Sequence, residues 1–104
     1  MGYQSINPFD GVLIESFDPL ADAKLEQRLA AADACFKTWK LTSYKERAAI
    51  IGKAAEILHE RADEFARIMT LEMGKRITEA RGEVEFSARI MAYYAKNAEE
   101  FLAP

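Results

Sequence analysis

Cysteine and histidine are nearly absent from this 104-residue chain, which has one of each. One cysteine cannot form a disulfide within the chain, and one histidine excludes a two-histidine metal site. Cys35 lies near the end of a predicted helix, whereas thiolates are activated at helix N-termini, so we interpret it as a small packing residue. His59 lies mid-helix among acidic residues, which predicts a solvated surface position.

Basic charge and long apolar runs are also lacking. The net charge is −3 and the isoelectric point is near 5.2, which argues against a nucleic-acid partner. No apolar run approaches the ~20 residues of a membrane span. The N-terminal residues lack the basic start and apolar core of a signal peptide. With no disulfide to form, these absences favour a cytoplasmic protein without a membrane partner.

The sequence also lacks a recognisable nucleotide cradle or catalytic constellation. Neither Gly-x-Gly-x-x-Gly nor a P-loop occurs, and the one Gly-Lys pair, Gly74-Lys75, follows a helix. Glu83 and Glu85 are two residues apart on a predicted helix, so they do not face each other. We therefore expect no catalytic and no cofactor-binding residue in this chain.

The N-terminal residues 3–17 predict a β-hairpin. Tyr3–Ile6 and Val12–Phe17 are rich in β-branched and aromatic residues, which favours two short strands. Pro8 and the pair Asp10-Gly11 lie between them, and that pair tolerates positive φ in a tight turn. A two-stranded hairpin is only marginally stable alone, so it should lie against other elements.

One uninterrupted helix is predicted over residues 43–73, and it organises the chain. Ser43 and Glu46 form a capping box at its start, and Gly74 is a left-handed residue just past its end. Its apolar residues recur at spacings of three and four, as on one face of a helix. They are Ala48, Ile51, Ala55, Leu58, Ala62, Phe65 and Met69.

Two further helices are predicted over residues 21–40 and 76–101. The first has a stripe that we expect to be buried, formed by Leu25, Leu29, Ala32, Phe36 and Trp39. The second is apolar on two faces, which indicates more than one neighbour. Gly52 and Gly82 lie mid-helix, where they either permit close approach of another backbone or are merely tolerated. The fold class is mainly helical, with three helices after a short hairpin.

Five short motifs occur in an order and spacing that resemble the aldehyde dehydrogenase family. They extend over residues 3–104. They are Ser5-Ile6-Asn7-Pro8 with Gly11; Ala31-Ala32 with Cys35-Phe36 and Trp39; Ser43 with Glu46-Arg47; Thr70-Leu71-Glu72-Met73-Gly74-Lys75 with Glu79-Ala80 and Glu83-Val84; and Tyr93-Tyr94-Ala95. The resemblance is strongest to the bacterial succinate-semialdehyde dehydrogenase branch.

The resemblance implies a segment of a larger enzyme. Family members have a dinucleotide-binding domain, a catalytic domain and an oligomerisation hairpin, and residues 1–104 resemble the N-terminal helical part of the first. The implied parent is a homo-oligomer that oxidises an aldehyde through a cysteine thiohemiacetal and reduces NAD or NADP. The family's nucleophile, general base and nucleotide turn come later than residue 104. We therefore expect the segment alone to be inactive. It does not indicate which aldehyde the enzyme oxidises or whether the nucleotide is NAD or NADP.

A monovalent-cation site is a further implication of the resemblance. Some family members hold such an ion with backbone oxygens of the opening strand and an acid on the third helix. Ser5, Ile6 and Glu85 occupy the matching positions. Other ligands of that site would come from beyond residue 104.

A different class of function is a free-standing helical module that associates with itself or a partner. The breadth of the apolar stripes favours this alternative, because one hairpin and one short helix cannot cover them. The expected partner is either the rest of the enzyme or a second copy. Pairing with a second copy would bury Phe65, Met69, Phe86, Ile90 and Tyr94.

Overall fold

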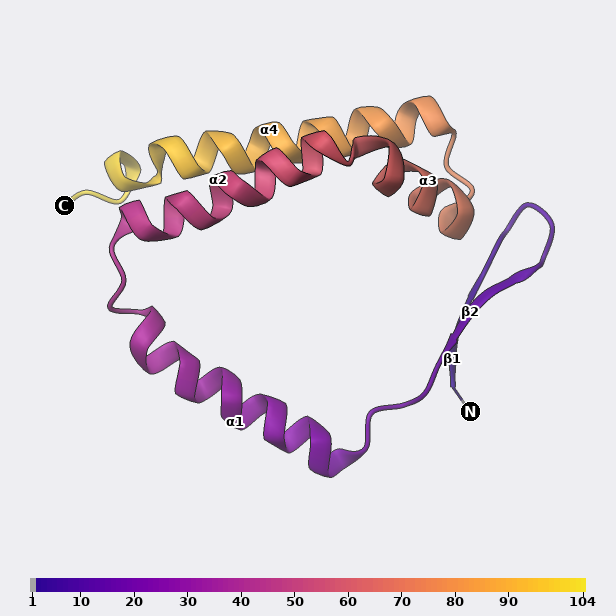
Figure 1. The fold of residues 1–104 in the computed structure, drawn as a ribbon, viewed down its shortest axis with the longest axis horizontal. Coiled ribbons are helices and arrows are strands. Elements are labelled where there is room, and N and C mark those ends of the chain that lie inside the picture. The colour runs from indigo at the N-terminus through magenta and orange to yellow at the C-terminus, as the bar shows by residue number, and fades with distance from the viewer. Residues whose placement is uncertain (1) are drawn as a thin grey trace.

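The computed structural model describes residues 2–104 and contains a hairpin followed by helices (Figure 1). The strands are β1 (Tyr3–Ile6) and β2 (Leu13–Phe17). The helices are α1 (Asp22–Trp39), α2 (Tyr44–Glu60), α3 (Ala62–Met73) and α4 (Ile77–Phe101). The predicted mainly helical fold class with an N-terminal hairpin is confirmed.

The hairpin forms through the turn residues that the sequence indicates. β1 and β2 are antiparallel, with a register shift between Ser5 and Ile6. Gly11 has φ of 72°, and its N–H donates to the Asn7 carbonyl at 2.8 Å. Asp10 Oδ1 accepts from the N–H of Val12 at 3.0 Å, which closes the turn. Local hydrogen bonding therefore determines where the chain reverses.

The predicted single helix over residues 43–73 is wrong, because it is interrupted at Arg61. That residue has φ of −104° and ψ of 23°, outside the helical region, and joins α2 to α3. Its guanidinium turns forward onto Glu64, with Nε 2.8 Å from Oε2, and lies 5.2 Å from the Phe65 ring centroid. These contacts favour a new helix start, and Asp63 and Glu64 complement the dipole of its first turn. The chain thus has four helices.

Both predicted ends of the central stretch are confirmed. The Ser43 hydroxyl accepts from the N–H of Glu46 at 3.2 Å, and Glu46 Oε2 accepts from the N–H of Ser43 at 2.7 Å. Gly74 ends α3 with φ of 71°, and a Cβ there would lie 3.1 Å from Pro8 Cγ. Glycine at this turn therefore permits both the left-handed backbone and the approach of the hairpin.

The core is a narrow seam of small residues between α4 and the α2–α3 pair. In residues 2–104, the buried apolar residues are Ala55, Ala62, Ala66, Ala80, Val84 and Ala88. Ala66 and Ala80 are completely buried. Small side chains let the helices approach closely, as Figure 1 shows for α4 lying along α2 and α3.

Helix α1 lies apart from this seam, and the prediction that its stripe is buried is wrong. Every residue of α1 is exposed, including Leu29 and Phe36. Cys35 is exposed as well, so its expected packing role is not seen among the described residues. The cause is the open arrangement in Figure 1, in which no other element of the described chain covers α1. The radius of gyration, 18.1 Å, exceeds the roughly 13 Å of a compact chain of this length.

Candidate interaction surface

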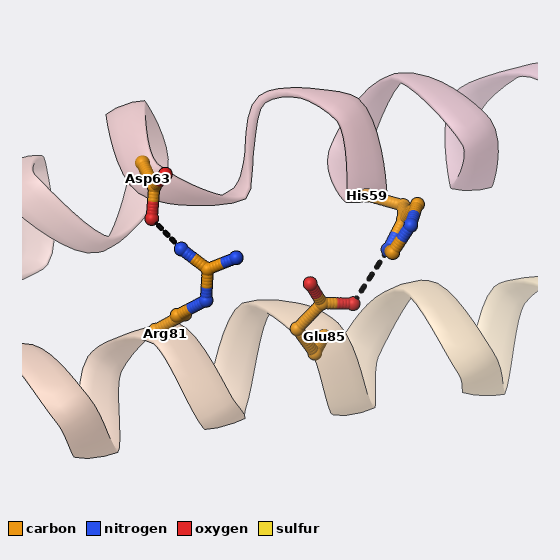
Figure 2. A network of polar contacts seen from close by, with 4 residues as sticks. All are labelled: His59, Asp63, Arg81 and Glu85. Carbon is orange, nitrogen blue, oxygen red and sulfur yellow. Dashed lines mark hydrogen bonds and ion pairs between the residues drawn. The ribbon is translucent and has the colours of Figure 1, made fainter.

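A pair of polar contacts, here called the polar ladder, connects α4 to both sides of the Arg61 break (Figure 2). His59 in the last turn of α2 has Nδ1 2.7 Å from Glu85 Oε2. Asp63 in the first turn of α3 pairs with Arg81. Arg81 and Glu85 are one helical turn apart on α4 and point toward their partners. The polar ladder therefore bridges α4 to α2 and α3 along one edge of the buried seam.

The polar ladder is not predicted by the sequence patterns. The acidic neighbours of His59 indicate a solvated position, and His59 is indeed exposed, but its ring contacts Glu85. The available signal was a basic-then-acidic order, His59 and Asp63, matched by Arg81 and Glu85 at the same spacing of four. In an antiparallel helix pair, these orders place a side-chain nitrogen across from a carboxylate at both positions. Glu83 and Glu85 have different partners, as their spacing predicts, because Glu83 pairs with Lys75.

The Gly74-Lys75 turn is occupied by structural contacts. Gly74 lies against Pro8, and the Lys75 ammonium pairs with Glu83 of α4. The Ser5 hydroxyl donates to Glu72 Oε1 at 2.8 Å, which ties β1 to the end of α3. These contacts hold the hairpin against the α3–α4 junction, as the marginal stability of a lone hairpin requires.

The residues of the predicted cation site have separate partners. Ser5 contacts Glu72, whereas Glu85 contacts His59 on α2. Ile6 pairs with Leu13 in the hairpin. Across residues 2–104, no three His, Cys, Asp or Glu residues are grouped to hold a metal ion. Because the predicted site uses backbone oxygens and further ligands from elsewhere, it stays a prediction.

One side of the seam that α4 forms with α2 and α3 is apolar, and we call it the apolar flank. Its residues recur at whole helical turns, and they are Ile51, Leu58, Phe65, Ile90 and Tyr94. A cavity of about 270 Å³ lies at one end of the flank, lined by Tyr44, Ile51, Tyr94 and Leu102 among others. Another of about 250 Å³ lies at the other end, lined by Leu58, Phe65, Ile68 and Val84 among others. The flank can accept apolar side chains from outside the described chain.

The other side, which we call the charged flank, carries the polar ladder and Arg89. A cavity of about 470 Å³ on this side is lined by His59, Glu85 and Arg89 around the small residues Gly52, Ala55 and Ala88. An added Cβ at Gly52 or Gly82 meets no atom within 4 Å. No contact within residues 2–104 therefore requires either glycine.

Because this surface is apolar, the helices can be compared with the requirements of a membrane-spanning segment. Among the helices of residues 2–104, none combines the length and the apolar composition that a bilayer crossing needs.

Comparison with known proteins places these features in a family context. The profile of the aldehyde dehydrogenase family matches residues 1–103. A Deinococcus radiodurans protein named succinate-semialdehyde dehydrogenase (NADP+) is 39% identical over 102 residues, covering 98% of this chain and 21% of that protein. An aldehyde dehydrogenase of Paenarthrobacter nicotinovorans is 39% identical over 104 residues, covering 100% and 23%.

The fold matches as well. A crystal structure of succinic semialdehyde dehydrogenase from Streptococcus pyogenes, in complex with NADP+ as the cofactor, has a TM-score of 0.92 and 40% sequence identity. The match covers 97% of this chain and 22% of that one. The chain thus spans about a fifth of the length of the proteins it matches and corresponds to an N-terminal segment of them.

Proposed function

This chain belongs to the aldehyde dehydrogenase family, and from that premise we propose that it is the N-terminal segment of a cytoplasmic enzyme that oxidises succinate semialdehyde to a carboxylate with NADP. The observation that carries the proposal is the match to relatives with that name over nearly all of this chain. Within the enzyme, we assign residues 1–104 to the dinucleotide-binding domain. The remaining polypeptide would supply the reacting groups and complete the oligomer.

The exposed apolar surface supports the view that this segment packs against further polypeptide. Large side chains that ordinarily fill a core are exposed, among them Phe36 and Trp39 of α1. A helix stripe of this kind is stable when another element covers it. A segment that contributes an outer layer to a larger domain accounts for both the amphipathic pattern and the open shape.

The residues of this segment do not fit the nucleotide. A dinucleotide pyrophosphate is held by backbone N–H groups of a glycine-rich turn that leads into a helix N-terminus. The Gly74-Lys75 turn is closed by Pro8, and the Lys75 ammonium is paired with Glu83. We therefore assign no catalytic step to these residues. Their proposed role is to form a scaffold, with the capping box, the Gly74 turn and the polar ladder fixing its shape.

Reading the gene beyond the codon for Pro104 and assaying the whole product tests the proposal. We expect an open frame that encodes an enzyme with higher kcat/KM for succinate semialdehyde than for other aldehydes, and for NADP than for NAD. A preference for an unrelated aldehyde would overturn the substrate assignment. The matched control is the purified 104-residue chain, which we expect to reduce no NADP. Micromolar NADP binding by that chain in calorimetry would contradict the scaffold role.

A free-standing module that associates with itself is the second candidate function. The exposed apolar flank is the observation that favours it. A stop codon directly after Pro104, together with a stable oligomer of the 104-residue chain, would favour this candidate over the first.

A further inference from the structure

The direction in which α1 leaves the rest of the molecule depends on a short link to α2. Helix α1 ends at Trp39 and α2 begins at Tyr44, so residues 40–43 join them. No element of residues 2–104 packs on α1, and Figure 1 shows it well apart from α4. Packing therefore does not set the direction of α1, and a contact that sets it must act on the link.

The guanidinium of Arg47, near the start of α2, reaches back across this link. Its Nε donates to the Thr42 hydroxyl oxygen at 2.9 Å, and its Nη2 donates to the carbonyls of Thr42 at 2.8 Å and Lys40 at 3.2 Å. The Thr42 hydroxyl in turn donates to the carbonyl of Trp39, the last residue of α1, at 2.7 Å. A continuous hydrogen-bonded path thus joins the start of α2 to the end of α1.

The surroundings of Arg47 are those of a structural group and not of a solvated surface charge. The residue is half-buried, and its guanidinium carbon lies 5.4 Å from the Tyr44 ring centroid. None of the ion pairs formed within residues 2–104 includes Arg47, so no carboxylate competes for its donors there. A planar guanidinium holds several acceptors in fixed directions, which the single ammonium of a lysine cannot do.

We propose that Arg47 is a positioning residue that fixes the direction of α1 relative to α2. Acting through the link, it holds the apolar stripe of α1 in one place although nothing in residues 2–104 covers that stripe. The inference gives a role to the third residue of the motif Ser43, Glu46 and Arg47, whose first two residues form the capping box. It concerns the 104-residue chain and does not rest on the proposed function.

Distances between spin labels on α1 and α4, measured by pulsed electron paramagnetic resonance, test this role. One label is placed on the exposed thiol of Cys35 and the other on Thr78→Cys, an exposed position of α4. We expect a narrow distance distribution in the parent chain. Arg47→Lys keeps the positive charge and loses the forked geometry, so it should widen the distribution at least about twofold. Arg67→Lys makes the same exchange at an exposed residue of α3 and should leave the width unchanged.

A second pair of labels separates positioning from general stability. In a Cys35→Ser background, Ala49→Cys on α2 and Thr78→Cys report on the α2–α4 pair, whose distance distribution should stay narrow in the Arg47→Lys variant. Widening of this second distribution would show that Arg47 stabilises the helices in general, and would overturn the proposal. A broad α1–α4 distribution in the parent chain, or an equally narrow one in Arg47→Lys, would overturn it as well.

Discussion

Helices α1 and α4 both carry apolar residues at helical spacing, yet every residue of α1 is exposed, whereas Ala80, Val84 and Ala88 of α4 are buried. The difference does not lie in the pattern, which predicts a covered face in both helices. It lies in what the chain brings near each helix, because α2 and α3 lie along α4 and nothing in residues 2–104 covers α1. An amphipathic stripe thus indicates a face that is suited to burial, and it does not show whether the same chain supplies an element to cover it.

The α1 helix and the α2–α4 region also differ in how their helix ends are capped. α2 begins with a capping box and α3 ends in a left-handed glycine. α1 begins after Ala21 without a side-chain cap. Just past its end, Arg47 donates to the carbonyl of the C-cap residue Lys40 and to that of Thr42 in the link to α2. The α2–α4 region is therefore held by local and tertiary contacts, and α1 mainly by its own backbone.

The largest expected difference between the regions comes from one substitution made in each. Ala66→Leu enlarges a completely buried residue of the seam and should lower the free energy of unfolding by about 1–3 kcal/mol. Ala32→Leu, on the exposed stripe of α1, should change it by less than about 0.5 kcal/mol. Urea denaturation of the 104-residue chain measures both. Similar losses from both would show that α1 is packed as tightly as the seam.

Glycine substitutions sharpen the comparison at a turn and within a helix. Gly74→Ala adds a Cβ at φ of 71° and close to Pro8, so it should destabilise the chain by roughly 1–2 kcal/mol. Gly82→Ala adds a Cβ in open space on α4 and should stabilise it by about 0.5–1 kcal/mol. Thermal unfolding distinguishes these signs. A neutral Gly74→Ala would mean that the turn relaxes without cost.

Substitutions at helix caps should also affect α2 and α1 differently. Ser43→Ala removes the hydroxyl that accepts from the N–H of Glu46, and should lower the free energy of unfolding by about 1 kcal/mol. Ala21→Ser offers α1 a cap that it lacks and should raise the helix content measured by circular dichroism. If Ser43→Ala leaves stability unchanged, the capping box does not stabilise the start of α2.

A smaller effect depends on pH. Hydrogen bonds from the backbone N–H of Ser43, and then from its hydroxyl, hold the pKa of Glu46 below its ordinary value. Because the folded pKa is lowered, the ionised carboxylate stabilises the fold above the unfolded pKa, and this contribution is lost as pH falls through the folded value. Glu46→Gln should therefore be less stable than the parent at neutral pH and converge with it in acid. A difference that grows in acid would contradict this account.

Several features could be predicted from sequence because their causes are local. The turn at Asp10-Gly11, the Ser43 and Glu46 box and the end at Gly74 each depend on a few neighbouring residues. The break at Arg61 could not be predicted from the stripe, because Ala55, Ala62 and Ala66 keep helical spacing across it. Neither proline nor glycine marks it.

The interaction surface was harder to predict because it depends on how separate helices align. The polar ladder needs the register of α2 and α3 against α4, which no local signal contains. The exposure of Leu29 and Phe36 on α1 depends on which elements lie near that helix, and no element of residues 2–104 packs on it. Family membership was accessible from sequence, because its motifs are short, ordered and spread over the whole chain.

Amide hydrogen exchange of α1, compared between the 104-residue chain and the full-length enzyme, tests the central claim most directly. If this chain is an outer layer of a larger domain, α1 amides exchange rapidly in the short chain and slowly in the full-length protein. The amides of α4 around its buried residues Ala80, Val84 and Ala88 should be protected from exchange in both proteins. Equal protection of α1 in the two proteins would contradict the claim, because α1 would then need no further polypeptide to cover it.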